Sequence, residues 1–119
     1  MRDVVSYFLR CAGEHGVGKT VLTKLVYFAE LESWEHDGHA LTATQFYRYT
    51  YGAWSPAVAD IARELPFVEY KRRFAGVYRE NRFYLGQDAP AEHLSDRARE
   101  ILEIIFALYG RWGAKAVGS

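Results

Sequence analysis

The sequence predicts an α+β fold that is mainly α, a compact helical domain with a small antiparallel β-hairpin or three-stranded sheet. Half of its 119 residues are apolar and 16 % are aromatic, which is enough for a core of its own. Apolar residues recur at helical spacing in four segments, whereas residues 68–85 are rich in aromatic and β-branched residues. By length, residues 1–119 form a single domain.

Apolar stripes and glycine stops mark the first two helices. A helix is expected from Asp3 to about Gly13, with apolar residues three and four positions apart. A second helix begins near Gly18 or Thr20 and ends near Gly38, because glycine can adopt the left-handed conformation that closes helices. Its broad stripe is typical of a central helix and comprises Val21, Leu22, Leu25, Val26, Phe28, Ala29 and Leu31.

Residues 42–52 carry two conflicting patterns. Thr42 and Gln45 have the spacing of a capping box, while the alternating tyrosines that follow are typical of a strand. We expect a helical turn that runs into a short extended piece. Ser55 and Pro56 then start a short helix that ends before Pro66.

The second half predicts strands followed by a last helix. Two or three short antiparallel strands are expected over residues 68–85, with Gly76 and Glu80–Asn81 as turn candidates. Ser95 caps the last helix and Gly110 ends it. One face of this helix is expected to carry Leu94, Ala98, Ile101, Ile105 and Leu108.

Composition narrows the class of protein. Fifteen basic residues balance fifteen acidic ones, so no net field attracts nucleic acid or an anionic membrane. One cysteine, Cys11, allows no internal disulfide and no cysteine-rich zinc site. No apolar run is long enough to span a membrane, and the first residues lack a signal-peptide pattern. We expect a cytoplasmic protein without metal or cofactor.

Residues 13–20, Gly-Glu-His-Gly-Val-Gly-Lys-Thr, match the P-loop pattern of nucleotide-binding proteins. In that pattern Lys19 would contact phosphates and Thr20 a magnesium ion. The mechanism needs a buried parallel strand before the first glycine, but here a helix is expected to precede it. A turn between two helices is favoured, and nucleotide binding stays the least favoured alternative.

Two further features, a group of acidic and histidine residues and the single cysteine, could bind a metal or act as a nucleophile, but a structural role is favoured for both. Glu32, Glu35, His36 and His39 could form a metal cluster, but a polar helix end with histidines near its carbonyl groups is favoured. Cys11 lies on or beside the apolar face of the first helix, so burial is favoured over a nucleophilic role. No catalytic residues are predicted.

Two segments could bind a partner. Tyr49, Tyr51 and Trp54 surround Gly52 just before the third helix, and such rings form either a packed corner or a binding anchor. In residues 68–85, aromatic residues alternate with the basic residues Lys71, Arg72, Arg73, Arg79 and Arg82. That pattern fits a half-buried hairpin, and it could also bind single-stranded nucleic acid or an acidic protein.

Two motifs resemble those of a known family, the Panacea domain or SocA-like antitoxin (phage-associated) family. Residues 24–30, Lys-Leu-Val-Tyr-Phe-Ala-Glu, resemble its Lys-Leu-Leu-Tyr-hydrophobic-Ala-Asp helix. Residues 51–56, Tyr-Gly-Ala-Trp-Ser-Pro, resemble its Tyr-Gly-Pro-aromatic-Ser-Pro signature. Three features depart from the family: Glu30 replaces aspartate, Ala53 replaces proline, and the last C-terminal helix is shortened or absent after Arg111. The matching positions are Lys24, Leu25, Tyr27, Glu30, Gly52, Ser55 and Pro56.

The resemblance covers about residues 5–110 and implies a bacterial, α-rich domain that neutralises a co-encoded toxin by direct binding, without enzymatic activity. Partner-binding residues are then expected at Tyr49, Tyr51, Trp54, Arg72, Arg73, Arg79 and Arg82. A DNA-binding autoregulator of the same operon is the alternative function. The toxin is the expected partner, self-association is a further alternative, and no membrane contact is expected.

Overall fold

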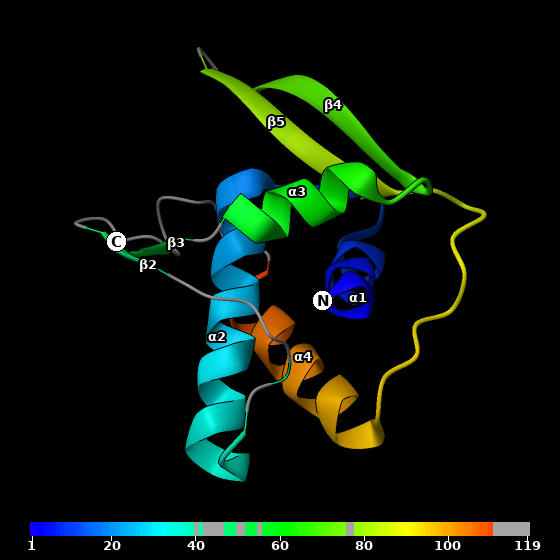
Figure 1. Cartoon of the computed structure of the whole chain (residues 1–119). Helices are drawn as coiled ribbons and strands as arrows, with labels where there is room; N and C mark the ends of the chain where they lie inside the picture. The colour runs from blue at the N-terminus through cyan, green and yellow to red at the C-terminus, as the bar shows by residue number, and fades with distance from the viewer. Residues whose placement is uncertain (40, 42–46, 50–51, 55, 76–77, 111–119) are drawn as a thin grey trace.

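A computed structural model describes residues 1–39, 41, 47–49, 52–54, 56–75 and 78–110. Within these ranges four helices lie beneath a twisted hairpin (Figure 1). The elements are α1 (Arg2–Ala12), the 3₁₀ turn η1 (Gly13–His15), β1 (Val17–Gly18), α2 (Lys19–Asp37), β2 (Tyr47–Tyr49), β3 (Gly52–Trp54), α3 (Pro56–Glu64), β4 (Val68–Ala75), β5 (Tyr78–Leu85) and α4 (Asp96–Tyr109). The expected fold class, mainly helical with a three-stranded antiparallel sheet, is confirmed.

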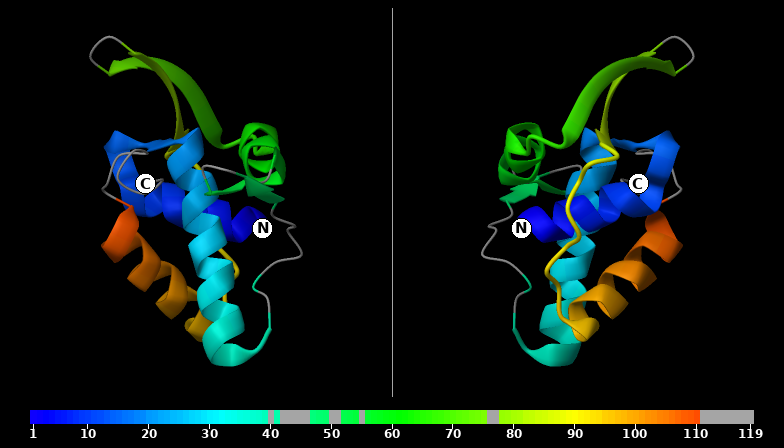
Figure 2. Two further views of the ribbon diagram at one scale, coloured as in Figure 1. Left: turned by 90° about the vertical axis from the view of Figure 1, so that its left-hand side faces the viewer. Right: turned by 90° about the vertical axis from the view of Figure 1, so that its right-hand side faces the viewer.

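The core forms where the apolar faces of the helices meet. Its largest fully buried side chains include Phe8 of α1, Leu22 and Leu25 of α2, Ile101 of α4 and Phe83 of β5. The central position expected for α2 is confirmed, because it packs against α1, α3, α4 and the sheet. Figure 1 shows α1 and α4 on the same side of α2, and Figure 2 shows the hairpin above the helices.

The expected helix ends agree with the structure. Gly38 closes α2 in the left-handed conformation with φ 73°, and its amide donates to the Trp34 carbonyl. The Ser95 hydroxyl accepts a hydrogen bond from the Ala98 amide and caps α4. At Asp37, the α2 terminus is joined to α4 by an ion pair with Arg97, 2.9 Å between Oδ2 and Nε.

Strand order in the sheet is β1–β5–β4, all antiparallel. β4 and β5 pair over their full length, from Val68 with Leu85 to Ala75 with Tyr78. The expected turn at Glu80–Asn81 is therefore wrong, since β5 runs straight through it. The other expected turn, at Gly76, lies outside the described residues.

Three side chains expected to be buried are exposed. Cys11 is exposed, because the buried face of α1 is centred on Val4, Val5, Phe8 and Leu9 and Cys11 lies beside it. Leu31 is 40 % exposed, since two residues beyond Ala29 a helix has turned by about 200°. Leu108 is 51 % exposed in the last turn of α4.

Candidate partner-binding surface

The family-like motif of α2 positions the chain that follows the helix. Glu30 is 7 % exposed, and its Oε2 accepts a hydrogen bond from the Leu41 amide at 3.2 Å. The Ser33 hydroxyl donates to the His39 carbonyl at 2.6 Å. Since both bonds hold backbone just after α2, this side of the helix fixes the start of the segment that leads to β2.

The other motif residues of α2 belong to the interior or its margin. Leu25 is fully buried and Lys24 is 8 % exposed. The half-buried Tyr27 ring lies 5.7 Å from the Phe28 ring. These positions are therefore part of the fold, and the structure gives Lys24 and Leu25 little surface to offer a partner.

The aromatic segment forms a second, two-stranded sheet. The register pairs Tyr47 with Trp54 and Tyr49 with Gly52, so the extended piece expected here is confirmed for residues 47–49. β3 packs against α2, and α3 begins at Pro56 as expected. Tyr51 and Ser55 lie outside the described residues, as does the helical turn expected over residues 42–46.

The basic segment is the β4–β5 hairpin, separate from the sheet of the aromatic segment. Arg72 pairs with Asn81, Arg73 with Glu80 and Arg79 with Phe74. In Figures 1 and 2 the closed end of this hairpin stands clear of the helices. The two segments named from the sequence are thus carried by different sheets, and their role in binding stays a prediction.

Arg82 has a structural role that its place in the basic cluster does not reveal. Its Nε donates to the His15 carbonyl at 3.0 Å and its Nη2 to the Gly16 carbonyl at 3.1 Å. Because Gly18 pairs with Arg82 in the sheet, the guanidinium and the β1–β5 pairing together fix the turn after α1 against β5.

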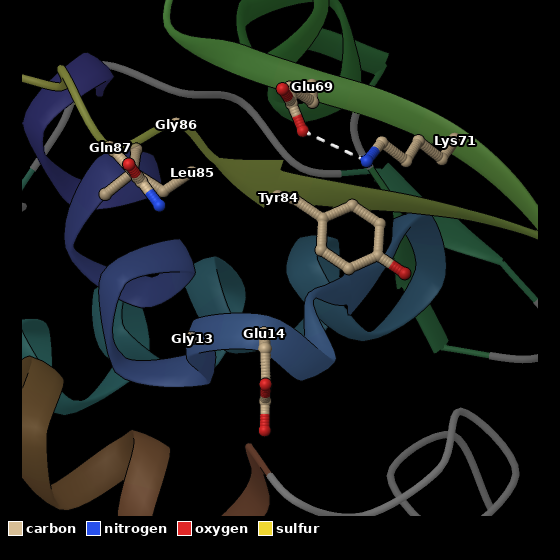
Figure 3. A pocket seen from close by; sticks show the side chains of 8 residues that line it. All are labelled: Gly13, Glu14, Glu69, Lys71, Tyr84, Leu85, Gly86 and Gln87. Carbon is tan, nitrogen blue, oxygen red and sulfur yellow. Dashed lines mark ion pairs between the residues drawn. The ribbon is translucent and has the colours of Figure 1, made fainter.

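An open groove lies between η1 and the hairpin (Figure 3). It has a volume of about 800 Å³ and is lined by Gly13, Glu14, Glu69, Lys71, Tyr84, Leu85, Gly86 and Gln87. Glu69 and Lys71 form an ion pair of 3.2 Å across its upper wall, and the Lys71 Nζ lies 5.5 Å from the centre of the Tyr84 ring. Glu14 of η1 lies across from the hairpin, and its side chain points away from Tyr84 in Figure 3.

Of the residues that line this groove, sequence reasoning named only Lys71 as a possible binding residue. Glu14, Glu69 and Gln87 come from three separate places in the chain, and only Glu14 lies in a recognised motif, the P-loop match of residues 13–20. The one local signal is the two-residue spacing of Glu69 and Lys71, which puts them on the same face of a strand. Glu69 and Lys71 pair with each other, and the other polar side chains of the lining are Glu14, Tyr84 and Gln87.

The P-loop match adopts a different arrangement from a phosphate-binding loop. It follows α1, whereas a P-loop follows a strand, and its residues 17 and 18 form β1, which runs antiparallel to β5. Lys19 is the first residue of α2 and is exposed. The expectation of a turn between two helices is confirmed.

In the described part of the chain, one group of possible metal ligands occurs, Glu32, Glu35 and His36 on α2, with ligand atoms within 4.8 Å of one another. His36 and Glu32 are already paired at 3.1 Å, and the group lies in the last turns of the helix at its surface. His39, also considered from the sequence, is outside this group. The arrangement agrees with the polar helix end expected there.

Among the described helices, none has the length and apolar character needed to cross a bilayer. The model of a protein family described as "Antitoxin SocA-like, Panacea domain" matches residues 22–118. The match starts inside α2 and includes β2 to β5, α3 and α4. A search of curated proteins found no match.

Proposed function

Because the chain belongs to the family of SocA-like antitoxins with a Panacea domain, we propose that it is a non-enzymatic antitoxin that neutralises a co-encoded toxin by binding it directly in the cytoplasm. The single observation that carries this proposal is the family match over residues 22–118. The match contains both segments that the sequence singles out for binding.

The arrangement of these segments supports a protein partner. The β4–β5 hairpin projects from the helices (Figure 1) and contains five basic residues against two acidic ones. Lys71 is paired with Glu69 and Arg82 donates to backbone carbonyls, and the sequence of the hairpin also contains Arg72, Arg73 and Arg79. An acidic surface on the toxin would complement this excess of basic residues.

The first experiment is co-expression with the gene next to this one in the native genome. If that neighbour is a toxin, its induction arrests growth and the antitoxin restores it. The purified proteins should form a complex of defined mass, which also reports whether this chain self-associates. Arrest without rescue, and no complex, would contradict the proposal.

Variants of the aromatic segment then locate the site. Trp54→Ala combined with Tyr51→Ala should weaken toxin binding while the circular dichroism spectrum is unchanged. Trp34→Ala is the matched control, because Trp34 is 58 % exposed on α2, outside both segments. If the double variant unfolds, the aromatic segment is core and the assigned site is wrong.

DNA binding by the β4–β5 hairpin is the second candidate function. The excess of basic residues in this hairpin favours it. Neutralising phosphates with lysine and arginine releases counterions, so such binding falls steeply with salt. A gel-shift titration with the DNA upstream of the gene at two salt concentrations tests it. Binding that does not change with salt would exclude this function.

A further inference from the structure

The outer edge of β4 is the longest free strand edge in the described part of the chain. Within these residues the sheet ends at β4, which pairs only with β5. The opposite edge of the sheet is covered by β1 at Arg82 and Phe83. Apart from Val68, whose amide donates to the Leu65 carbonyl, this free edge presents a row of backbone groups that can accept another strand.

The hydrogen-bond pattern identifies the backbone groups that point outward. The Gly86 amide donates to the Phe67 carbonyl at 2.7 Å, which makes 67 and 86 a hydrogen-bonded pair in a register continued by Val68 with Leu85. Hydrogen-bonded and non-hydrogen-bonded pairs alternate along an antiparallel ladder. The backbone groups of Lys71 and Arg73 therefore bond to β5, as residue 67 bonds to residue 86. The amide and carbonyl groups of Tyr70, Arg72 and Phe74 face away from β5.

We propose that this edge binds an extended, acidic segment of the toxin as an added β-strand, through the outward backbone groups of Tyr70, Arg72 and Phe74. The inference rests on the proposed function. Strand addition takes its affinity from main-chain hydrogen bonds and its selectivity from side chains at alternate positions. The basic residues next to the edge, three of them consecutive at 71–73, select acidic residues in the added strand.

The position of the edge suits this partner. At the closed end of the hairpin, β4 stands clear of the helices in Figures 1 and 2. Nearer α3, the Val68 amide already donates to the Leu65 carbonyl, and the Arg63 guanidinium lies 5.3 Å from the Tyr70 ring. The added strand therefore lies along residues 70–75 and ends where α3 approaches β4.

The test uses the whole protein and a random library of ten-residue peptides displayed on phage. Enriched peptides are expected to carry acidic residues at alternate positions. Bound to such a peptide, the amides of Tyr70, Arg72 and Phe74 should exchange with solvent at least tenfold more slowly, whereas the inward amides of Lys71 and Arg73 are protected with or without it. The proposal would be overturned if the selection enriched no acidic, extended peptide. It would also be overturned if the bound peptide protected amides other than those of Tyr70, Arg72 and Phe74.

Two variants at one position separate the backbone from the charge. Arg72→Pro removes an outward amide but no hydrogen bond of the β4–β5 ladder, and an edge strand tolerates a proline at such a position. This variant should lower the affinity for the peptide at least tenfold. Arg72→Gln removes the charge and keeps the amide, so it should lower affinity only a few-fold. If Arg72→Pro does not fold, the exchange pattern of the wild-type complex decides the question.

The same variants distinguish this proposal from the proposed function. If Arg72→Pro folds, binds the peptide as well as Arg72→Gln does and still neutralises the toxin, the strand-addition mode is wrong while the antitoxin function stands. If the wild-type protein binds acidic peptides at β4 but rescues no neighbouring toxin, the proposed function fails and the edge still binds an acidic segment.

Discussion

Arg10 and Glu92 join the first helix to the loop before the last helix, with 2.8 Å between Nε and Oε1. The same carboxylate oxygen accepts a hydrogen bond from the Ser6 hydroxyl at 3.0 Å, and the Glu92 carbonyl accepts one from Arg99 of α4 at 2.9 Å. Glu92 is only 7 % exposed. One loop residue thus connects α1, the 86–95 loop and α4.

Replacing Glu92 by glutamine should destabilise the protein. The amide keeps the shape of the carboxylate but carries no charge to pair with Arg10, and hydrogen bonds to charged groups contribute about 1.5 to 3 kcal/mol. Because Arg10 is about half exposed, we expect a loss near the lower end, about 1.5 kcal/mol in the free energy of unfolding. Urea denaturation measures it, with Glu103→Gln at an exposed position of α4 as the control. Equal midpoints for the two variants would contradict the structural role of the ion pair.

The pH dependence of stability should change in the same variant. Burial raises the pKa of Glu92, but hydrogen bonds from Arg10 and Ser6 outweigh it, so that the pKa lies below its ordinary value. A carboxyl with a lowered folded-state pKa stabilises the protein above its unfolded-state pKa and loses this contribution as the pH falls through the folded-state value. The free energy of unfolding of the wild type should therefore fall as the pH drops through and below the range in which a glutamic acid ordinarily titrates. In Glu92→Gln this fall should be smaller, and parallel curves would show that another group is responsible.

Two glycines of the turn after α1 offer a matched pair of substitutions. Gly13 and Gly16 have φ of 58° and 66°, which strains any other residue, but a Cβ on Gly13 would meet nothing within 4 Å. A Cβ on Gly16 would lie 2.6 Å from the Tyr84 ring and 2.7 Å from the Phe83 carbonyl oxygen. Gly13→Ala should cost about 1 to 3 kcal/mol from backbone strain alone, and Gly16→Ala at least about 1 kcal/mol more from overpacking.

Thermal and urea denaturation of both alanine variants measure this difference. Similar costs for the two variants would mean that β5 can move away from the turn. In that case the hydrogen bonds of Arg82 to the same turn would not hold it rigidly.

Sequence patterns predicted those parts of the fold that depend on residues close together in the chain. The apolar face of α1, the Ser95 cap and the Gly38 stop each depend on residues within a few positions of one another, and all are confirmed. β1 has only two residues and exists because it pairs with β5, about 65 positions away. Its sequence therefore contains no strand signal of its own.

The candidate site was predicted only in part for the same reason. Alternating aromatic and basic residues predicted the strands of the hairpin, since that pattern reports a half-buried sheet. The carbonyl partners of Arg82 belong to His15 of η1 and to Gly16 just after it. Glu14 of the groove also lies in η1, which approaches the hairpin only in the folded chain. Glu92, a lone acid in a loop, likewise carries no sequence pattern that indicates burial.

The P-loop match should bind no nucleotide. In a phosphate-binding loop, successive amides and a helix N-terminus converge on the phosphates after a buried parallel strand. Here α1 stands in place of that strand, and Arg82 of β5 holds the carbonyls of His15 and Gly16. Millimolar Mg-ATP should leave the melting temperature of the wild type and of Lys19→Ala unchanged, with Mg²⁺ alone as the control. An ATP-dependent rise in the wild type that Lys19→Ala abolishes would overturn this prediction, because it would require the turn to rearrange around phosphate.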